Sequence, residues 1–551
     1  MADAEDVSVS TDDRLLAELG YRAEFKRELN VWTTTAFSFS VMAAVASTSA
    51  TFVFPLQYGG HAGIVWGWFA SSCFVMLVAL CLAEMCSSMP TSGGLYYWSA
   101  KLAPKPWAPL ASWITAWANM LGHIALFCSI EFTNAAMIAD AVTMGSNFRK
   151  SYSDAIRYGI CLALIFAHGI LCCSATKVLA KLNIAYVLTN LGTFVALMIL
   201  LGVKGVPHQS ASSAFGDFEN NSSWSNNGFA FLLSMTGSMW CLTGYDSASH
   251  VAEETSNAAT VGPLAIIMAV LGTETVGWAM SLMLSFCLKS PKALLQTSLY
   301  TPVAQLYHDV IGKQGALVIW SLAIVIQFNS AAAEAVDTSR VIYAFARDGA
   351  LPFSRLLSSI NKRTNTPVCA VWFTAFGAAI IGLMGLQDTA YTALSSTSII
   401  ALYISYMIPI FLRITSGRAK FRPGPFRLGP LVYPIGTIAC LYVALITLVF
   451  LFPAAPAPAV SDMNWSVLVL GAILGGSLVY YAISARKWFK GPVRETDESE
   501  YVAEELSAAE GDAVKAKSEK QLVTVADLYT EWNTVTPKAV WGRGFGNVRP
   551  R

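Results

Sequence analysis

Long apolar segments alternate with short polar segments along most of the chain, a pattern typical of a protein that crosses the bilayer many times. A membrane-spanning helix needs about 20 mostly apolar residues. By this criterion we expect twelve spans, at 33–57, 63–84, 107–139, 156–174, 182–203, 229–250, 263–288, 315–343, 367–385, 390–412, 431–452 and 465–485. The predicted fold class is therefore all-α and polytopic, with a twelve-helix domain over 33–485.

The polar segments at the two ends of the chain are expected on one face of the membrane, because the number of spans is even. Lysine and arginine are concentrated in loops on that face, for example Arg413, Arg418 and Lys420. Since positively charged loops stay in the cytoplasm, we expect a cytoplasmic N-terminal tail (1–32) and a cytoplasmic, mostly disordered C-terminal tail (486–551). Loops assigned to the opposite face contain the candidate N-glycosylation sites, which are Asn220, Asn221 and Asn464.

The composition agrees with a bilayer environment and excludes several functions. Hydrophobic residues make up 55% of the chain and charged residues 13%, whereas a soluble domain carries about 25% charged residues. A net charge of +1 gives no basis for binding nucleic acid. The cysteines form no pair of CxxC motifs, and His123, His168 and His250 are widely separated in the sequence. We therefore expect no metal site and no cofactor, and we interpret these histidines as structural.

Two predicted spans are interrupted by small and polar residues. The first contains "AAVASTSATF" (43–52), and the sixth contains "TGYDSASH" (243–250), about 200 positions later. Irregular backbone at membrane depth survives only where it lines a cavity, and transporters place such breaks in two inverted repeats. This spacing predicts repeats at 33–203 and 229–412, followed by two extra helices at 431–485. The alternative is that these small residues only pack helices together.

Acidic residues inside apolar spans are candidates for function, because a charge in the membrane is costly. These acids are Glu131, Asp246, Glu334 and Asp337. We interpret Glu131, Asp246 and Glu334 as candidates for proton coupling, and Glu334 also for binding a substrate amine. The alternative for Glu334 is a hydrogen bond to a hydroxyl or backbone group. We expect Asp337 to form a surface pair with Arg340, three residues away.

Three loop and helix motifs resemble a known transporter family. They are "AEMCSSMPTSGGLYYWSAKLAP" (83–104), "LTGYDSASHVAEET" (242–255) and "SRVIYAFARDGALPFS" (339–354). Together they resemble the amino acid/polyamine/organocation permeases, in particular the amino acid–choline branch and its γ-aminobutyrate permeases. The resemblance implies a leucine-transporter-like fold of two inverted five-helix repeats and secondary active transport, usually driven by a proton gradient.

The resemblance also implies roles for particular residues. It assigns Ser47 to the substrate segment of the first helix, where the family usually has glycine near Ala43 and proline near Ala46. With neighbouring and facing polar residues, the expected substrate site comprises Ser47, Thr48, Ser49, Gly244, Tyr245, Asp246, Asn329 and Glu334. The motif at 83–104 implies a cytoplasmic gating loop whose marker residues are Glu84, Pro90, Gly93 and Gly94.

These features favour a proton-coupled permease for a small amino acid such as γ-aminobutyrate, in the plasma membrane rather than the vacuolar membrane. A permease for choline, a polyamine or another organic cation is the alternative, because the intramembrane acids suit a substrate without a carboxylate. A nutrient receptor with the same fold is a further alternative. We do not expect an enzyme, since the sequence contains no HExxH motif and no recognisable serine–histidine–aspartate arrangement.

Overall fold

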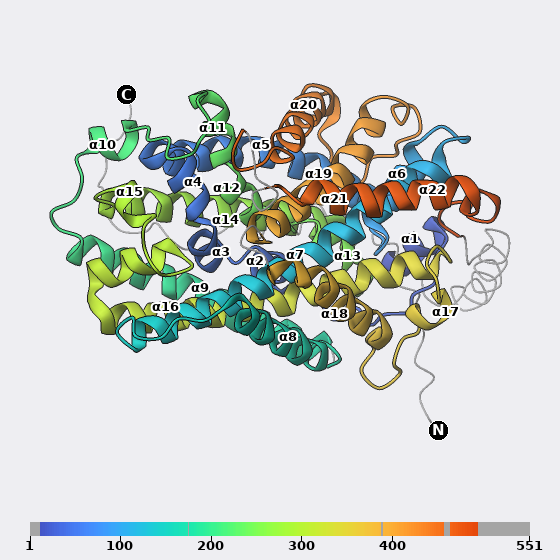
Figure 1. Cartoon of the computed structure of the whole chain (residues 1–551). Helices are drawn as coiled ribbons and strands as arrows, with labels where there is room; N and C mark the ends of the chain where they lie inside the picture. The colour runs from blue at the N-terminus through green and yellow to red at the C-terminus, as the bar shows by residue number, and fades with distance from the viewer. Residues whose placement is uncertain (1–10, 175, 387–389, 457–462, 494–551) are drawn as a thin grey trace, which may run out of the picture. The chain divides into compact units, whose positions relative to one another are not determined.

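Within the part of the chain that the structure describes, ten helices are long and apolar enough to cross a membrane. The structure is a computed structural model that describes residues 11–174, 176–386, 390–456 and 463–493 (Figure 1). The long helices are α5 (Gly60–Ser88), α7 (Ala108–Gly145), α8 (Asp154–Leu171), α9 (Thr176–Lys204), α14 (Ala258–Cys287), α16 (Pro302–Arg347), α18 (Val368–Gly382), α19 (Ala390–Ile414), α20 (Val432–Phe450) and the last span, which joins α21 (Ser466–Leu470) to α22 (Gly476–Ile483). Each corresponds to a predicted span.

The remaining two predicted spans, the first and the sixth, are built from short helices. The first consists of α2 (Val31–Met42), α3 (Ala44–Thr51) and α4 (Val53–Tyr58). The sixth consists of α11 (Asn227–Ser234), α12 (Thr236–Cys241) and α13 (Ser247–His250). The all-α, twelve-span prediction is thereby confirmed, and the two interrupted spans are the two whose sequences predicted interruption.

Several helices are longer than the apolar segments that predicted them. For example, α7 continues to Gly145, and α16 extends from Pro302 to Arg347 with a non-helical residue at Gly312 (φ 77°). Hydropathy marks only the part of a helix that needs to be apolar. The backbone keeps its hydrogen bonds beyond that part, so polar turns extend the helix into the interfacial region.

The centre of the helical body is formed by α7, which packs against α16 on one side and against α19 on another. Helix α7 is buried along nearly its whole apolar length, whereas α8 and the last span expose most of theirs. Exposed apolar faces on α8 and the last span are what a lipid environment requires. A polar residue on α7 therefore faces other helices rather than lipid.

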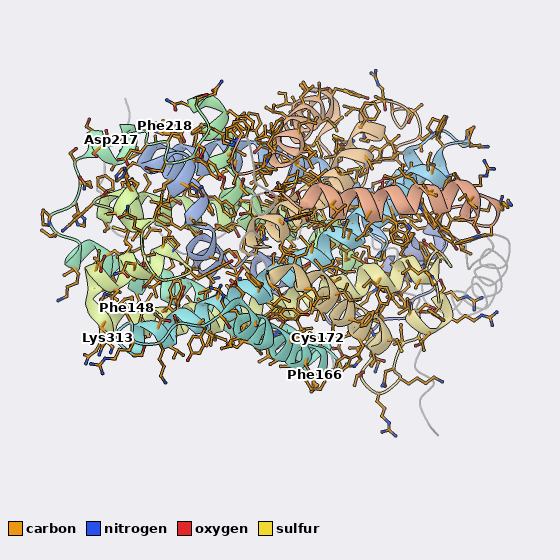
Figure 2. All side chains as sticks on the ribbon, viewed as in Figure 1. Phe148, Phe166, Cys172, Asp217, Phe218 and Lys313 are labelled. Atoms are coloured by element: carbon orange, nitrogen blue, oxygen red, sulfur yellow. The ribbon has the colours of Figure 1, made fainter. Side chains whose placement is uncertain are left out.

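The two ends of the helical body carry different short elements. Helices α1 (Thr11–Leu19) and α17 (Ser354–Leu357) lie at one end, and α10 (Ala211–Gly216) and α15 (Pro291–Leu294) lie at the other (Figure 1). Lys313, labelled in Figure 2 at the α10 and α15 end, donates a hydrogen bond to the carbonyl of Gly145 at 2.8 Å. Lys313 also donates to Oδ1 of Asn147 at 2.6 Å, so the end of α7 and the loop after it are tied to α16.

The N-terminal segment 11–30 packs against the other end of the helical body. Leu29 pairs with the strand-like segment after α13, since its N–H donates to the carbonyl of Glu254 at 3.0 Å. Tyr21 donates to the carboxylate of Asp348, just beyond α16, at 3.2 Å, and Tyr96 donates to the same carboxylate at 2.8 Å. Residues 494–551, where we expected a disordered tail, lie outside the described residues.

We expect Asp348 to make stability depend on pH. Burial raises the pKa of Asp348 from 3.8 to about 6, although Arg347 and the donated hydrogen bonds act in the opposite direction. The protonated carboxyl therefore contributes stability that is fully present below about pH 4 and is lost as the pH rises through about 6. The shift corresponds to a free energy on the order of 3 kcal/mol. Melting of the detergent-solubilised protein should show this loss between pH 4.5 and 7.5.

The Asp348→Asn variant should show a flatter pH dependence, because the substituted group does not titrate. Asp309→Asn serves as a matched control, since the side chain of Asp309 is 60% exposed. An Asp348→Asn variant with the same pH dependence as the parent would contradict the assignment.

Candidate functional site

The break in the first interrupted span occurs at a single residue. Ala43 adopts a left-handed conformation (φ 43°, ψ 57°) between α2 and α3. This conformation costs an L-amino acid roughly 1–2 kcal/mol and favours glycine. Ala44–Thr51 is regular helix, and Phe52, between α3 and α4, keeps right-handed helical angles (φ −57°, ψ −24°), so within the predicted stretch 43–52 the backbone leaves the helical conformation at Ala43.

The break in the sixth span is longer and depends on a glycine. Residues 242–246 separate α12 from α13, and Gly244 has φ 92°. A Cβ at Gly244 would lie 2.5 Å from Val41 Cγ1, so glycine is required both by conformation and by space. The predicted role of Gly244 as a position of helix interruption agrees with this geometry.

The two breaks lie next to each other and next to α16. Ser330 on α16 donates a hydrogen bond to the carbonyl of Val41 at 2.6 Å, just before the break at Ala43. A Cβ placed on Gly244 would lie 3.7 Å from Glu334 Oε2, also on α16. The interrupted backbone of both spans therefore converges on the acidic part of α16, as two transporter repeats arranged around one site would require.

The carboxylate of Asp246 accepts hydrogen bonds from three other helices. Tyr406 on α19 donates to Oδ1 at 2.6 Å, and Asn119 on α7 donates to Oδ2 at 3.2 Å. The Nε2 atoms of His123 and His250 also lie 3.2 Å from Oδ2. All five side chains are at least 98% buried. Asp246 is thus a buried carboxylate surrounded by donors, which is the condition for keeping a charge inside the membrane.

His123 bridges Asp246 to the acids of α16. Its Nδ1 lies 2.9 Å from Glu334 Oε1 and 3.4 Å from Asp337 Oδ2, while its Nε2 faces Asp246. Our interpretation of His123 and His250 as separate, lone histidines was therefore wrong, because both lie beside Asp246. Their distance in the sequence hid their proximity, because α7 and α13 are about a hundred residues apart and meet only in the folded chain.

The prediction for Asp337 was also wrong. Asp337 is fully buried beside His123, and it does not form a surface pair with Arg340. Arg340 instead donates from Nε to Glu254 at 2.8 Å. Asp337 lies near the C-terminal end of the predicted span 315–343, and neighbouring helices cover this part of α16, so a residue expected at the surface lies inside the protein. Three carboxylates and two histidines are consequently enclosed together.

These groups are close enough to surround a cation, but their contacts are those of a hydrogen-bond network. Both oxygens of Asp246 already accept a hydrogen bond. Oδ2 accepts from the amide nitrogen of Asn119, and Oδ1 accepts from the hydroxyl of Tyr406 at 2.6 Å. Unused acceptor capacity lies instead on α16, where Glu334 Oε2 and Asp337 Oδ1 have no hydrogen-bond partner among the described residues. The cluster therefore keeps its unused acceptor capacity on α16 and not on Asp246.

Glu131 belongs to a separate pair. Its Oε1 lies 2.5 Å from Nδ1 of His168 on α8, and both side chains are fully buried. Neither residue is among the hydrogen-bond partners of Asp246 or Glu334. Asn329 lies on α16 and is buried, and its amide nitrogen has no partner among the described residues.

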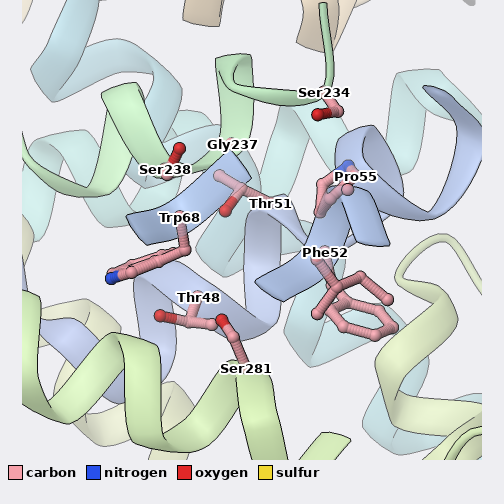
Figure 3. Close-up of a pocket in the computed structure, with 11 residues that line it drawn as sticks. Thr48, Thr51, Phe52, Pro55, Trp68, Ser234, Gly237, Ser238 and Ser281 are labelled. Atoms are coloured by element: carbon pink, nitrogen blue, oxygen red, sulfur yellow. The ribbon is translucent and has the colours of Figure 1, made fainter. Parts of the chain in front are cut away.

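The predicted substrate residues of the first span lie beyond the break. Ser47, Thr48 and Ser49 are buried in α3, and Ser49 donates to the carbonyl of Val45 within its own helix at 2.8 Å. Thr48 lines a cavity of about 10 Å³ between α3, α5, α12 and α14 (Figure 3). That volume holds about one water molecule, so the conformation is closed around this part of the predicted site.

Tyr245 lies in the break itself and is fully buried. Its ring centroid is 5.3 Å from that of Tyr406, the residue that donates to Asp246. The predicted neighbours Tyr245 and Asp246 are therefore joined through α19, which the sequence motifs did not indicate.

The predicted gating loop connects α5 to α6 (Gly94–Leu102) and is buried at Pro90, Gly93 and Gly94. Gly94 has φ 43°, and a Cβ there would lie 2.8 Å from Ser249 Oγ on α13. A Cβ on Gly93 would lie 2.9 Å from the hydroxyl of Tyr96. Gly94 thus lets the loop approach α13 closely, and Gly93 makes room for Tyr96 of α6. Glu84 precedes the loop, and its carboxylate lies 3.3 Å from Arg413 Nε.

The candidate glycosylation residues are partly buried. The amide nitrogen of Asn220 donates to the carbonyl of Trp224 at 2.7 Å, and that of Asn464 donates to the carbonyl of Phe450 at 2.7 Å. Asn221 donates to the carbonyl of Leu56 at 3.5 Å. Glycosylation at these three positions remains a prediction.

Comparison with known proteins agrees with this geometry. The amino acid permease family matches the chain over residues 29–473. The chain belongs to the amino acid permease family. An uncharacterized amino-acid permease of Schizosaccharomyces pombe is 36% identical over 482 residues, which cover 87% of this chain and 86% of that protein. Amino-acid permease BAT1 of Arabidopsis thaliana is 34% identical over 493 residues, which cover 87% of this chain and 95% of that protein.

The permease is accordingly a multi-pass membrane transporter of amino acids and not an enzyme. The resemblance to the amino acid/polyamine/organocation superfamily is confirmed, while the γ-aminobutyrate and choline specificities remain predictions. Reasoning from sequence missed Asn119, His123, His250 and Tyr406 as the residues that surround the carboxylate of Asp246. The signal that could have found His123 and Asn119 is their spacing of four on one apolar helix, which places both on one face of α7.

We expect Gly244→Ala to impair the permease severely. The new methyl group would overlap Val41 and would hold the chain in a conformation that L-residues rarely adopt, so the two breaks should separate. Uptake by the variant at the cell surface should fall about tenfold or more, because the strained backbone at position 244 costs roughly 1–3 kcal/mol. Gly192→Ala is the matched control, because a Cβ there meets nothing within 4 Å. Parent-like uptake by Gly244→Ala would contradict this account of the break.

Proposed function

We propose that the permease carries a small amino acid such as γ-aminobutyrate together with protons, by alternating access around the two interrupted spans. The observation that carries the proposal is the contact of both His123 ring nitrogens with carboxylates, Asp246 on one side and Glu334 on the other. A neutral imidazole has only one N–H. Both contacts are hydrogen bonds only if the ring is doubly protonated or if one carboxyl holds the extra proton. The cluster is therefore suited to binding a proton.

The position of this proton site supports its coupling to substrate. Glu334 lies beside Gly244, and Ser330, one turn earlier on α16, binds the backbone next to the break at Ala43. Helix α3 begins at Ala44, and the first N–H groups of a helix lack partners within that helix. Such N–H groups suit the carboxylate of an amino acid. A substrate at the breaks would then contact the same α16 residues that share the proton.

In this proposal the substrate site comprises the backbone at the breaks with Tyr245, Asn329 and Glu334, and the proton site comprises His123, Asp246 and Glu334. Glu131 forms its own pair with His168 and is a second candidate for a proton. Both ends of the chain are proposed to be cytoplasmic, and the plasma membrane is the proposed location. The loop containing Pro90, Gly93 and Gly94 is proposed to act as the cytoplasmic gate.

We expect Glu334→Gln to abolish proton-driven uptake. Labelled γ-aminobutyrate would be supplied to cells that lack their own transporters and express the parent, Glu334→Gln or the exposed control Asp309→Asn. Removing one partner from a buried hydrogen bond costs about 1–3 kcal/mol, which corresponds to about tenfold or more in uptake. A proton uncoupler should suppress uptake by the parent and by Asp309→Asn but should have no effect on the residual uptake of Glu334→Gln.

Two results would contradict the proposal. Absence of uptake by a parent protein present at the cell surface would exclude γ-aminobutyrate as the substrate. Uncoupler-sensitive uptake at the parent rate by Glu334→Gln would remove Glu334 from the coupling mechanism.

A second candidate function is favoured by the excess of carboxylates in the cluster. Asp246, Glu334 and Asp337 outnumber His123 and His250, so the enclosed groups have a net negative charge unless they hold additional protons or a cation. An organic cation such as choline or a polyamine would supply that charge.

Competition distinguishes the two candidates. If the substrate is an amino acid, a tenfold excess of unlabelled choline or spermidine should leave its uptake nearly unchanged, because neither compound has a carboxylate to bind the breaks. Inhibition by either amine as strong as that by the unlabelled amino acid would favour the cation permease.

A further inference from the structure

His250 contacts two hydrogen-bond acceptors at once. Its Nε2 lies 3.2 Å from Asp246 Oδ2, and its Nδ1 lies 3.2 Å from the backbone carbonyl oxygen of Ser92. A carbonyl oxygen accepts hydrogen bonds and never donates them. Asp246 Oδ2 also accepts from the amide of Asn119, so it acts as an acceptor here too. Both contacts of His250 are hydrogen bonds only when the imidazole carries a proton on each nitrogen.

Ser92 belongs to the loop between α5 and α6, so His250 joins this loop to the interrupted span. The N–H of Ser92 donates to Glu253 Oε1 at 3.0 Å, and Glu253 pairs with Arg347 through two contacts of 2.9 Å. Gly94 lets the loop approach α13 so closely that a Cβ would lie 3.4 Å from His250 Cε1. The loop is thus held on one side by an ion pair and on the other by the His250 ring.

The charged groups around His250 are those of the central cluster. Asp246 faces its Nε2, the ring of His123 packs edge to face with a centroid distance of 5.4 Å, and Asp337 of α16 acts on it electrostatically. Helix α2, which also packs on α13, has no ionisable side chain, and the acidic residue of α14 is Glu274, several turns away from the α13 end of that helix. Burial and the ring of His123 disfavour the doubly protonated ring, whereas Asp337 and the hydrogen bond to Asp246 favour it.

We infer that His250 is a proton-binding residue through which the central cluster controls the α5–α6 loop. This inference rests on the proposed proton coupling. When protonated, His250 donates to both Asp246 and Ser92 and holds the loop against α13. When the proton leaves, only one N–H remains, and the other nitrogen presents a lone pair to an acceptor. The charged partner Asp246 retains the donor, because hydrogen bonds to charged groups are stronger, so the bond to Ser92 is lost.

The direction of the effect follows from this geometry. Protonation closes the loop, and proton release frees it, so release of the proton and opening at the loop occur in the same step. His250 acts here as a positioning residue for the gate and does not need to contact the substrate. Its replacement by glutamine, which is neutral at every pH, should separate substrate movement from the proton gradient.

The test uses the full-length permease in proteoliposomes with labelled γ-aminobutyrate. Two activities are compared for the parent, His250→Gln and the exposed control His208→Gln: accumulation driven by an inward proton gradient, and exchange of substrate at equal pH on both sides. For His250→Gln, we expect gradient-driven accumulation to fall about tenfold or more while exchange changes less than about threefold. Exchange by the variant should also lose the pH dependence that the parent shows. The control should behave as the parent.

Every other outcome contradicts either the role inferred for His250 or the proposed proton coupling on which it rests. Parent-like accumulation and pH dependence in His250→Gln would overturn the inference alone. Loss of both activities by a folded His250→Gln, or failure of both His250→Gln and His250→Asn to reach the membrane at any pH, would assign His250 a role in substrate movement or packing instead. A parent that transports without responding to the gradient would overturn the proposed proton coupling, and with it the inference.

Discussion

The buried carboxylate of Asp246 is the constraint on which the arrangement of the central helices depends. A charge inside the membrane persists only when donors replace the water that it has lost. Asp246 receives these donors from Asn119 and His123 on α7, from Tyr406 on α19 and from His250 on α13. Because the donors come from separate helices, the carboxylate fixes their relative positions as well as its own charge. The helix break at Gly244 is what allows a residue of the sixth span to reach this position.

The two acids that α16 contributes to the cluster differ from Asp246 in how many hydrogen bonds their carboxylates accept. Asp246 is saturated with donors, whereas Glu334 and Asp337 retain oxygens without hydrogen-bond partners among the described residues. Asp246 therefore holds the surrounding helices through its donors, whereas the unpartnered oxygens of Glu334 and Asp337 can each accept a further hydrogen bond. Glu334 also lies beside the two breaks, so a substrate there would meet the unsaturated acid. The structure thus separates the residue that orders the site from the residue best placed to change state.

The end of the helical body that carries α1 is closed by a second set of contacts. Tyr21, Tyr96 and Asp348 connect the N-terminal segment, α6 and the end of α16, and the pair of Glu253 and Arg347 lies beside them. His250 reaches from the central cluster to the loop that this set encloses. The central cluster and the α5–α6 loop are therefore connected through α13, because Asp246 precedes this four-residue helix and His250 at its end contacts Ser92 of the loop.

Much of the fold could be predicted because membrane insertion imposes a local rule. Each span needs its own apolar length, so hydropathy located all twelve spans, and the small and polar residues at 43–52 and 243–250 identified the two that are interrupted. The rule is weaker inside a span. The small and polar residues located the first break only to within ten residues, 43–52. The break is at Ala43, and Ser47, Thr48 and Ser49 lie in regular helix.

The sequence by itself determined the membrane fold, the family and the acidic residues with functional potential, since these follow from composition and from contiguous motifs. Only the tertiary structure decided which residues meet. His123, His250 and Asp337 were interpreted as structural or surface residues, and they lie with Asp246 and Glu334 in one buried cluster. Spacing along a helix reveals neighbours within about one turn. The packing of α7, α13 and α16 brings together residues more than a hundred positions apart, such as His123 and Asp246, and no local pattern records that contact.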